Sequence, residues 1–227
     1  MEYKNLIGGA ITDKINIFNC DCMELLKQTP DNYYSLALVD PPYGIDADVK
    51  NSTNKMQTKK SATKSKKYGS QLWDSDIPTD EYFDELKRVS KKQIIWGANY
   101  FGLVGGMIYW HKNVTMPTYS TGELAWVSWL NKLDFVNIAW HGMIQHDMAN
   151  KETRIHPTQK PVALYKWILD KYAKQGDKIL DTHLGSGSIA IACHDYKYDL
   201  TACELDKEYF DKAMERITNH TNQTKLF

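Results

Sequence analysis

The amino-acid sequence predicts an α/β protein. Short apolar runs alternate with amphipathic stretches of helical period along most of the chain, which is the pattern of strands separated by helices. Two of the apolar runs end in a carboxylate that precedes a glycine turn or a double proline, which is typical of sites at strand ends. A chain of 227 residues can bury a core without disulfides or metal, so we expect a single domain over residues 1–227.

The predicted strands are short runs rich in apolar and β-branched residues. They are Ile15–Asn19, Leu36–Asp40, Gln93–Trp96, Met107–Trp110, Lys178–Asp181 and Tyr198–Cys203.

Four stretches are expected to be helical. Three of them repeat apolar side chains every three or four residues, which forms one buried stripe. The stripes are Tyr82, Leu86 and Val89; Tyr165, Ile168, Leu169 and Tyr172; and Phe210, Ala213, Met214 and Ile217. The fourth helix runs from Ile189 to about Tyr196. Thr79 is expected to cap the first helix with its side chain.

The middle of the chain follows a different pattern. Between Thr115 and Met148, the apolar residues Trp126, Trp129, Phe135 and Trp140 lie in short strand-like runs without a helical period. We therefore expect a small, irregular and β-rich insert over about residues 112–150.

Positive charge is concentrated in one segment, although the formal net charge of the chain is +0. No acidic residue occurs between Asp48 and Asp74, and the lysines there stand among Ser, Thr, Asn and Gln. We expect a mobile basic loop over about residues 45–75, which is either a contact for nucleic-acid phosphates or a solvated, disordered insertion. The candidate phosphate contacts are Lys50, Lys59, Lys60, Lys64, Lys66 and Lys67.

Other features limit the class of protein. No long apolar stretch predicts a signal peptide or a membrane span, so we expect a cytoplasmic protein without a membrane partner. Cys20 and Cys22 form a C-x-C pair, whose spacing suits neither a zinc site nor a thioredoxin-like motif. We expect these cysteines, Cys193 and Cys203 to be buried free thiols, and we expect no metal site.

The first candidate site follows the strand that ends at Asp181. Thr182-His183-Leu184-Gly185-Ser186-Gly187 leads from this strand into a helix, and glycines at such a turn let backbone amides approach a ligand. The next strand ends at Glu204, about 20 residues further on, where a carboxylate can accept hydrogen bonds from ribose hydroxyls. The spacing favours a nucleoside cofactor over a plain turn at the start of a helix.

The residues of this site favour S-adenosylmethionine over a dinucleotide. A dinucleotide site needs a further glycine near the start of the helix, and none occurs between Gly187 and Lys207. The Asp181 carboxylate would repel a phosphate, but it could accept hydrogen bonds from a cationic amino group such as that of methionine.

The second candidate site is Asp40-Pro41-Pro42-Tyr43, directly after an apolar strand. The two prolines fix two φ angles and donate no backbone hydrogen bond, so their carbonyls and the flanking side chains are held in one arrangement. Asp40 and the Pro41 carbonyl can accept both hydrogens of an exocyclic amino group, and Tyr43 offers a ring for stacking. The alternative is an ordinary proline turn at the end of a strand.

These residues resemble the amino-methylating DNA methyltransferases, whose catalytic signature is Asp, Asn or Ser followed by Pro-Pro and an aromatic residue. Asp40–Tyr43 matches it completely, and the order of catalytic motif first and glycine motif last is that of the β class. His156-Pro157-Thr158-Gln159-Lys160-Pro161 resembles the segment before the family's cofactor turn. The resemblance covers most of the chain. It implies a Rossmann-like S-adenosylmethionine-dependent methyltransferase fold with a mixed, mostly parallel sheet, whose middle insert recognises the target.

The resemblance also implies roles for individual residues. Asp40, Pro41, Pro42 and Tyr43 would be catalytic, and a larger set would surround the cofactor. That set is Asp21, Cys22, Asp40, His156, Lys160, Asp181, Thr182, His183, Gly185, Ser186, Gly187, Glu204 and Leu205. The sequence departs from the family after Asp181, where Pro-Phe usually follows the acid, so only proximity to the cofactor is expected of His183.

The activity implied is site-specific methylation of N6 of adenine in double-stranded DNA, on a base that has been flipped out of the helix. N4 of cytosine uses the same geometry, and Asp at the first motif position favours adenine by resemblance. Methylation of RNA and a DNA-binding module without transfer activity are the other hypotheses. A homodimer and a cognate restriction endonuclease stay open as partners.

Overall fold

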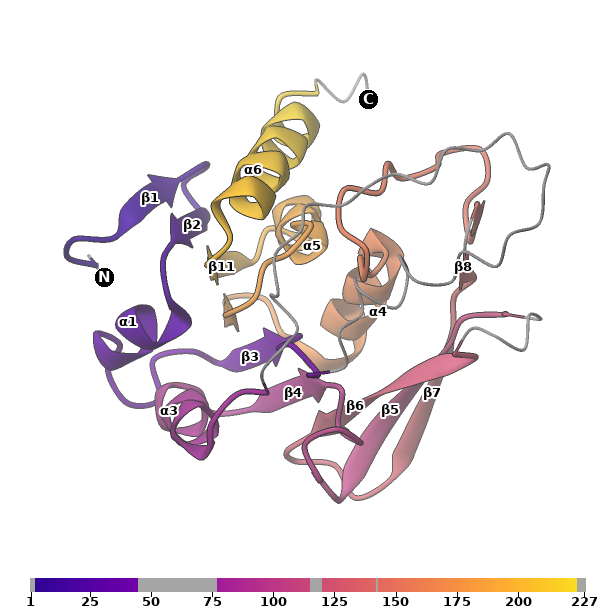
Figure 1. Cartoon of the computed structure of the whole chain (residues 1–227), viewed down its shortest axis with the longest axis horizontal. Helices are drawn as coiled ribbons and strands as arrows, with labels where there is room; N and C mark the ends of the chain where they lie inside the picture. Colours follow the sequence, from indigo (N-terminus) through magenta and orange to yellow (C-terminus); the bar gives the residue numbers. More distant parts are fainter. Residues whose placement is uncertain (1–2, 45–76, 115–119, 142, 224–227) are drawn as a thin grey trace, which may run out of the picture.

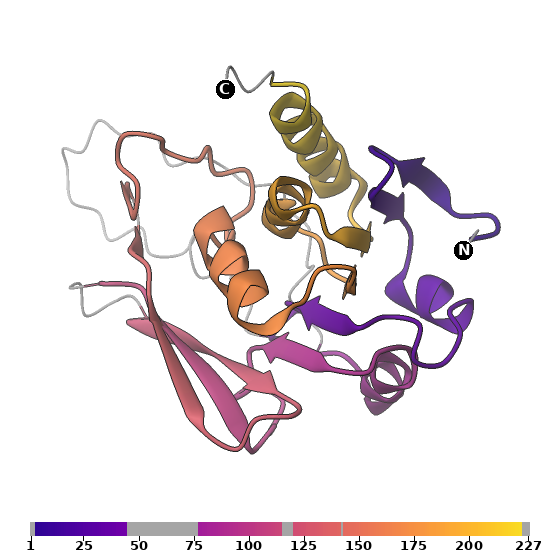
Figure 2. The same cartoon turned by 180° about the vertical axis from the view of Figure 1, so that it is seen from behind.

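The computed structural model of the chain describes residues 3–44, 77–114, 120–141 and 143–223. Within them, strands form one sheet in the order β1-β2-β11-β10-β3-β4-β6-β5-β7, with helices on both faces (Figure 1, Figure 2). Five neighbouring strands run parallel: β2 (Ile15–Asn19), β11 (Asp199–Glu204), β10 (Lys178–Asp181), β3 (Leu36–Val39) and β4 (Gln93–Trp96). The expected α/β fold with a mixed, mostly parallel sheet is confirmed.

Antiparallel pairing occurs towards the two ends of this sheet. β1 (Ile7–Ala10) pairs antiparallel with β2. At the other end, β6 (Gly122–Val127) pairs antiparallel with both β4 and β5 (Gly106–His111), and β7 (Leu133–Asn137) runs parallel to β5. A small separate sheet joins β8 (Trp140–His141) to β9 (Ile144–Gln145).

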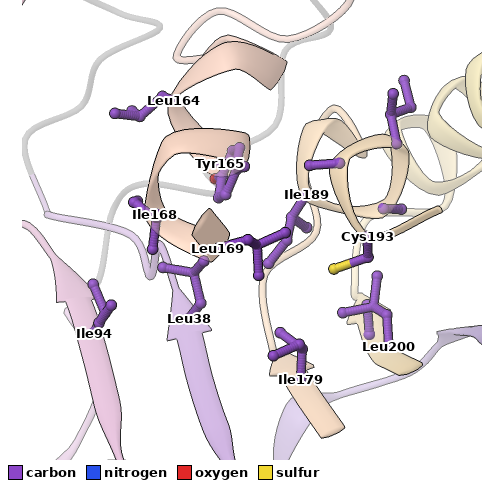
Figure 3. Close-up of a cluster of buried hydrophobic side chains, with 14 of the residues drawn as sticks. Leu38, Ile94, Leu164, Tyr165, Ile168, Leu169, Ile179, Ile189, Cys193 and Leu200 are labelled. Carbon is purple, nitrogen blue, oxygen red and sulfur yellow. The ribbon is translucent and has the colours of Figure 1, made fainter. Parts of the chain in front are cut away.

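Two helical layers cover the parallel strands. The helices α4 (Val162–Tyr172), α5 (Ser188–Tyr196) and α6 (Lys207–Thr221) lie on one face, and α1 (Cys22–Lys27) and α3 (Asp80–Val89) lie on the other (Figure 1). Because alternate side chains of a strand point to opposite faces, β3 contributes to both cores. Leu38 packs with Ile168 and Leu169 of α4 (Figure 3), whereas Ala37 and Val39 belong to the cluster that contains Leu86 of α3. Among the described residues, no helix is long and apolar enough to cross a membrane.

Most expected elements are present, with small differences at their ends. The strands at Ile15, Gln93 and Lys178 have the predicted bounds, and the other three differ by one residue at one or both ends. The apolar stripe of α3 is buried as predicted, but Tyr172 and Met214 in the later stripes are only partly buried. The expected side-chain cap by Thr79 was wrong. Thr79 stands at the N-cap, yet its backbone carbonyl accepts the Tyr82 amide at 3.1 Å and its side chain makes no capping hydrogen bond.

The segment around residues 112–150 is β-rich, as expected, but its centre is regular. β6 and β7 lie in this segment and are strands of the main sheet. The side chains of Ala125 and Val127 in β6 are completely buried. They belong to the same core cluster as the buried side chains of α4. Within the described residues, this segment therefore adds β6 and β7 to the main sheet, whereas β8 and β9 form a sheet of their own.

Candidate functional site

The site begins where the parallel strands end. Their carboxyl ends lie along one edge of the sheet, where Asp21 follows β2, Glu204 and Asp181 end β11 and β10, Asp40 follows β3, and Gly97 follows β4. The helix after β10 lies on the opposite face from the helix after β3. The strand order therefore changes direction between β10 and β3, which is where open α/β sheets bind ligands.

Two cavities lie at this edge and share a wall. The larger has a volume of about 1210 Å³ and lies over the ends of β2, β11 and β10. The smaller, of about 460 Å³, lies over the ends of β3, β4 and β6. Asp40, Pro42, Thr158 and Lys160 line both cavities. A ligand in one cavity would therefore meet a ligand in the other at the Asp40–Pro42 turn.

The larger cavity collects most of the residues that were assigned to a cofactor. In its wall are Asp21, Cys22, Asp40, His156, Lys160, Thr182, His183, Gly185, Ser186, Glu204 and Leu205. Asp181 and Gly187, the remaining two, lie behind the wall. Gly187 has a left-handed backbone with φ 75°, and a Cβ there would come within 2.7 Å of Ile217 on α6. Gly187 is thus required for packing of the turn against α6.

Two carboxylates hold the glycine turn by its backbone. Glu204 Oε2 accepts the Gly185 amide at 2.8 Å, and Asp181 Oδ1 accepts the His183 amide at 3.1 Å. Burial raises the pKa of Asp181 to about 8, against the lowering effect of the His183 amide. Burial also raises the pKa of Glu204. Each of these two carboxyl groups therefore already accepts a hydrogen bond from the protein's own backbone, although we expected both to face a ligand.

Arg216 of α6 holds the same turn from the other side. Its guanidinium donates to the Ser186 carbonyl at 2.7 Å and to the Ser188 hydroxyl at 3.0 Å. It also pairs with Glu152 at 2.6 Å, and Glu152 in turn accepts the Val162 amide at the start of α4. The glycine turn, α6 and the segment before α4 are thereby connected through one cation.

The side walls of the larger cavity carry neutral histidines. Burial lowers the pKa of His183 to about 4 and, together with the charge of Lys160, lowers the pKa of His156 to about 3. His183 Nδ1 lies 2.9 Å from the Thr182 hydroxyl, and the His156 ring packs against Tyr209. Asp21 caps α1 by accepting the Met23 amide at 2.8 Å. Near neutral pH, the imidazoles would not repel a cationic ligand.

The smaller cavity contains a buried network of charged side chains around Asp40. The Tyr43 hydroxyl donates to Asp40 Oδ1 at 2.5 Å, and Lys160 Nζ donates to Asp40 Oδ2. Lys160 Nζ is also 3.0 Å from Glu123 Oε2, while Lys112 pairs with the other oxygen of Glu123. The side chain of Lys160 is only 2% exposed.

Protonation within this network follows from burial and pairing. Burial raises the pKa of Asp40, and Glu123 adds to this effect while Lys160 opposes it. Burial would also raise the pKa of Glu123, but Lys112 and Lys160 hold it at about 2. For Lys160, burial favours the neutral amine, yet the two carboxylates outweigh burial and raise its pKa. Glu123 and Lys160 are therefore ionised near neutral pH.

Tyr43 lies against the backbone at the end of β4. Gly97 there has φ 78°, and a Cβ on it would come within 2.3 Å of the Tyr43 ring. The Phe101 ring packs edge-on against Tyr43, and the Tyr100 ring stacks on Tyr43 at a centroid distance of 4.8 Å. Tyr100 is 44% exposed in the cavity wall. One face of Tyr43 is thus covered, so the exposed ring at this site is that of Tyr100.

Sequence reasoning missed Glu123, Lys112, Gly97 and Tyr100. None of these residues belongs to a continuous motif. Glu123, for example, comes close to Asp40 only because β6 pairs with β4 in the sheet. The available signal was an acidic residue in the apolar run Gly122–Val127, where a strand with a buried face would otherwise carry no charge. The six lysines from Lys50 to Lys67 that were assigned to DNA phosphates lie outside the described residues.

Comparison with known proteins finds a matching family model and solved structures of similar fold. Residues 126–215 match a family model for N6/N4 methyltransferases, described as DNA methylase. This range contains His156, Lys160 and the glycine turn, and it begins after Asp40–Tyr43. Among solved structures, the M1.HpyAVI–SAM complex is similar with a TM-score of 0.58 and 21% identity, covering 89% of this chain and 99% of that chain. PvuII DNA methyltransferase, described as cytosine-N4-specific, has a TM-score of 0.58 and 14% identity, covering 93% of each chain. The expected methyltransferase fold is confirmed.

Sequence relatives match over shorter ranges. Type II methyltransferase M.HpaI of Haemophilus parainfluenzae is 36% identical over 74 residues, which is 33% of this chain and 24% of that protein. The probable type III HindVI Mod subunit of Haemophilus influenzae is 42% identical over 88 residues, which is 37% of this chain and 12% of that protein. The chain therefore spans a quarter or less of the length of these two curated relatives.

Proposed function

We propose that this chain, whose residues 126–215 match the N6/N4 family model described as DNA methylase, methylates an exocyclic amino group of a base in DNA. The observation that carries the proposal is the meeting of two cavities at Asp40–Pro42. Cofactor and base would occupy one cavity each, so that the reacting atoms face each other across the shared wall. Positioning of this kind can contribute about 7–11 kcal/mol to lowering a barrier.

The proposed cofactor is S-adenosylmethionine, which supplies an electrophilic methyl group when bound. The larger cavity fits it in volume and chemistry, because its wall combines the glycine turn, Glu204 at the end of the neighbouring strand, and neutral histidines that tolerate a positive charge. The similar structure of M1.HpyAVI is described as a complex with SAM. Asp181 does not line this cavity and is 2% exposed, so we propose that its carboxylate attracts the cationic amino group from behind the turn.

The proposed role of the smaller cavity is to hold the base. The Asp40 carboxylate would accept a hydrogen bond from the amino group and stabilise the positive charge that develops on nitrogen. Pro41 and Pro42 keep that carboxylate at the strand end, and Tyr43 orients it through the hydroxyl contact at 2.5 Å. We propose Tyr100, whose ring is itself stacked on Tyr43, as the stacking surface.

The acceptor that we favour is N6 of adenine, because Asp at position 40 is the adenine-type residue of the resembling family. N4 of cytosine is the second candidate, favoured by the likeness to PvuII DNA methyltransferase. Double-stranded DNA as substrate, base flipping, contacts from the basic segment and a restriction-modification setting belong to the same proposal. The named relatives are a type II methyltransferase and a restriction-modification subunit.

Transfer of labelled methyl from S-adenosylmethionine to duplex DNA of mixed sequence tests the proposal. Nucleoside digestion and mass analysis identify the product. N6-methyladenine is expected, and N4-methylcytosine would move the assignment to the second candidate. Transfer to RNA alone, or cofactor binding without any transfer, would refute the proposed activity.

The role of Asp40 has its own test. Asp40→Ala removes every hydrogen-bond acceptor of the side chain, so we expect methyl transfer to fall by about a hundredfold or more. Cofactor binding should be largely retained, because most of the larger cavity is unchanged. Asp13→Ala, at an exposed position, is the matched control. Turnover of Asp40→Ala close to that of the control would show that Asp40 is not catalytic.

A further inference from the structure

In the smaller cavity, Lys160 and the amino group of a target base would compete for the Asp40 carboxylate. In the structure, Lys160 donates to Asp40 Oδ2 and Tyr43 donates to Oδ1. A target amino group would also offer N–H donors to this carboxylate. While Lys160 stays paired with Asp40, it competes with the amino group for the oxygens and neutralises the charge that should stabilise the reacting nitrogen.

Lys160 is too deeply buried to give up Asp40 without another anion. Its side chain is 2% exposed, and an ammonium left unpaired in such a place is strongly destabilising. Glu123 supplies the alternative, because its Oε2 already lies 3.0 Å from Lys160 Nζ. The Trp96 and Tyr43 rings lie 5.2 and 5.5 Å from Nζ, so aromatic faces also stabilise the cation near this position.

We propose that Glu123 is a positioning residue that takes over Lys160 when the target amino group engages Asp40. In the free protein, the Lys160 ammonium thus lies where the amino group of the target base would bind. It pairs with Glu123 when the base enters the cavity and with Asp40 again when the base leaves. That the target base displaces Lys160 from Asp40 rests on the proposed function. The two-anion site, in which Asp40 and Glu123 both hold Lys160, is a property of the free protein. No proton changes place in the exchange.

Lys112 is what makes Glu123 suitable for this role. It pairs with Glu123 Oε1, the oxygen that Lys160 does not use. Glu123 therefore remains an anion and stays in place whether Lys160 leans towards it or towards Asp40. With Asp40, Glu123, Lys112 and Lys160 all ionised, the four side chains carry no net charge, which favours their burial.

The free protein tests the two-anion site without any substrate. Lysine side chains are labelled with ¹⁵N, and the ammonium signal of Lys160, identified by its loss in Lys160→Gln, is followed over pH in Asp40→Asn and in Asp40→Asn/Glu123→Gln. We expect Lys160 to keep its charge into the alkaline range in Asp40→Asn, because Glu123 still holds it. In the double variant, burial should dominate and the ammonium should be lost at clearly lower pH. Equal titration in the two variants would overturn the proposal.

Kinetics test the exchange in the reaction. Glu123→Gln should lower kcat/KM for DNA by about tenfold or more, because Lys160 can no longer leave Asp40 for an anion. Cofactor affinity should stay within about twofold of wild type, since Glu123 lines only the smaller cavity. Glu215→Gln, at an exposed position of α6, is the control.

A double variant separates this role from a merely structural one. If Glu123 acts by receiving Lys160, Glu123→Gln should cost little when Lys160→Gln is already present, and the two losses should not add. Additive losses would overturn the proposal, as would an unchanged kcat/KM in Glu123→Gln. If the wild-type protein transfers no methyl group, the proposed function fails, while the titration of Lys160 still decides whether Glu123 holds it.

Discussion

The protonation of Asp181 links cofactor binding to pH. Because burial raises the pKa of this carboxyl to about 8, the free protein holds it mostly protonated at neutral pH. A cationic amino group beside it would favour the carboxylate and lower this pKa. Binding of S-adenosylmethionine should therefore release protons and tighten as the pH rises from about 6 to about 8.

Calorimetry in buffers of different ionisation enthalpy measures this proton release. Asp181→Asn cannot ionise, so its cofactor affinity should be weaker and should lose this pH dependence. Asp13→Asn, just before the amino end of β2 and so away from the carboxyl ends that form the site, should behave like the wild-type protein. The same pH dependence in Asp181→Asn and in the wild type would assign the released proton to another group.

At the scale of residues, sequence reasoning succeeded where side chains of a site are consecutive. Asp40–Tyr43 and the turn from Asp181 to Gly187 each carry several informative residues in a row, and both lie at the shared edge of the sheet. Glu123 is 83 positions from Asp40 and meets it only through the pairing of β6 with β4. A single carboxylate in a strand has no local signal for such a partner.

Gly97, at the end of β4, leaves room for the Tyr43 ring because it has no side chain. A Cβ at Gly97 would come within 2.3 Å of the Tyr43 ring, whereas a Cβ at Gly102 would meet nothing within 4 Å. Both glycines have positive φ, at 78° and 63°. Gly97→Ala and Gly102→Ala therefore share a backbone cost of about 1–3 kcal/mol, but only the first displaces Tyr43.

We expect Gly97→Ala to lower methyl transfer by about a hundredfold, because small displacements of positioning groups are costly. Gly102→Ala should keep most of its activity at a similar loss in Tm. Transfer rates and thermal unfolding of the two variants decide this. A similar loss of activity in both would mean that backbone strain, and not displacement of Tyr43, is responsible.

The last helix supports the cofactor turn through Arg216. Arg216→Met keeps the apolar stem but removes the hydrogen bonds to Ser186 and Ser188 and leaves Glu152 without its cation. We expect S-adenosylmethionine affinity to fall by about tenfold or more, with kcat retained at saturation, because bonds to charged groups contribute about 1.5–3 kcal/mol. Equilibrium binding and saturation kinetics measure the two effects. Lys212→Met, at a surface ion pair of the same helix, is the control, and unchanged affinity in Arg216→Met would limit Arg216 to folding.

At the scale of elements, the parallel strands were predictable because they are short apolar runs buried on both faces. β1 was not predicted, since Ile7–Ala10 contains two glycines and its side chains are mostly exposed. α1 was missed because Cys22–Lys27 is too short to display a helical period. β6 and β7 were recognised as strand-like, but their place in the main sheet depends on pairing between distant segments, which local patterns do not encode.

The whole chain has a formal net charge of +0, so attraction to DNA has to come from local charge. Among the described residues at the strand ends, the buried histidines are neutral, and carboxylates pair with both Lys160 and Lys112. Among the sequence's candidates, this leaves the lysines between Lys50 and Lys67, which follow Tyr43 closely in the chain. We propose that they contact phosphates around the flipped base.

Replacing these lysines should weaken binding to all DNA sequences alike, because phosphates carry no sequence information. For each phosphate contact that is lost, the slope of log affinity against log salt concentration should become shallower by about one. Lys66→Ala, and a variant with Lys64, Lys66 and Lys67 all replaced by Ala, are compared by fluorescence anisotropy over a range of salt concentrations. Lys174→Ala, at an exposed position between α4 and β10, serves as the control. If the slope of the triple variant equals that of Lys174→Ala, Lys64, Lys66 and Lys67 do not contact phosphates.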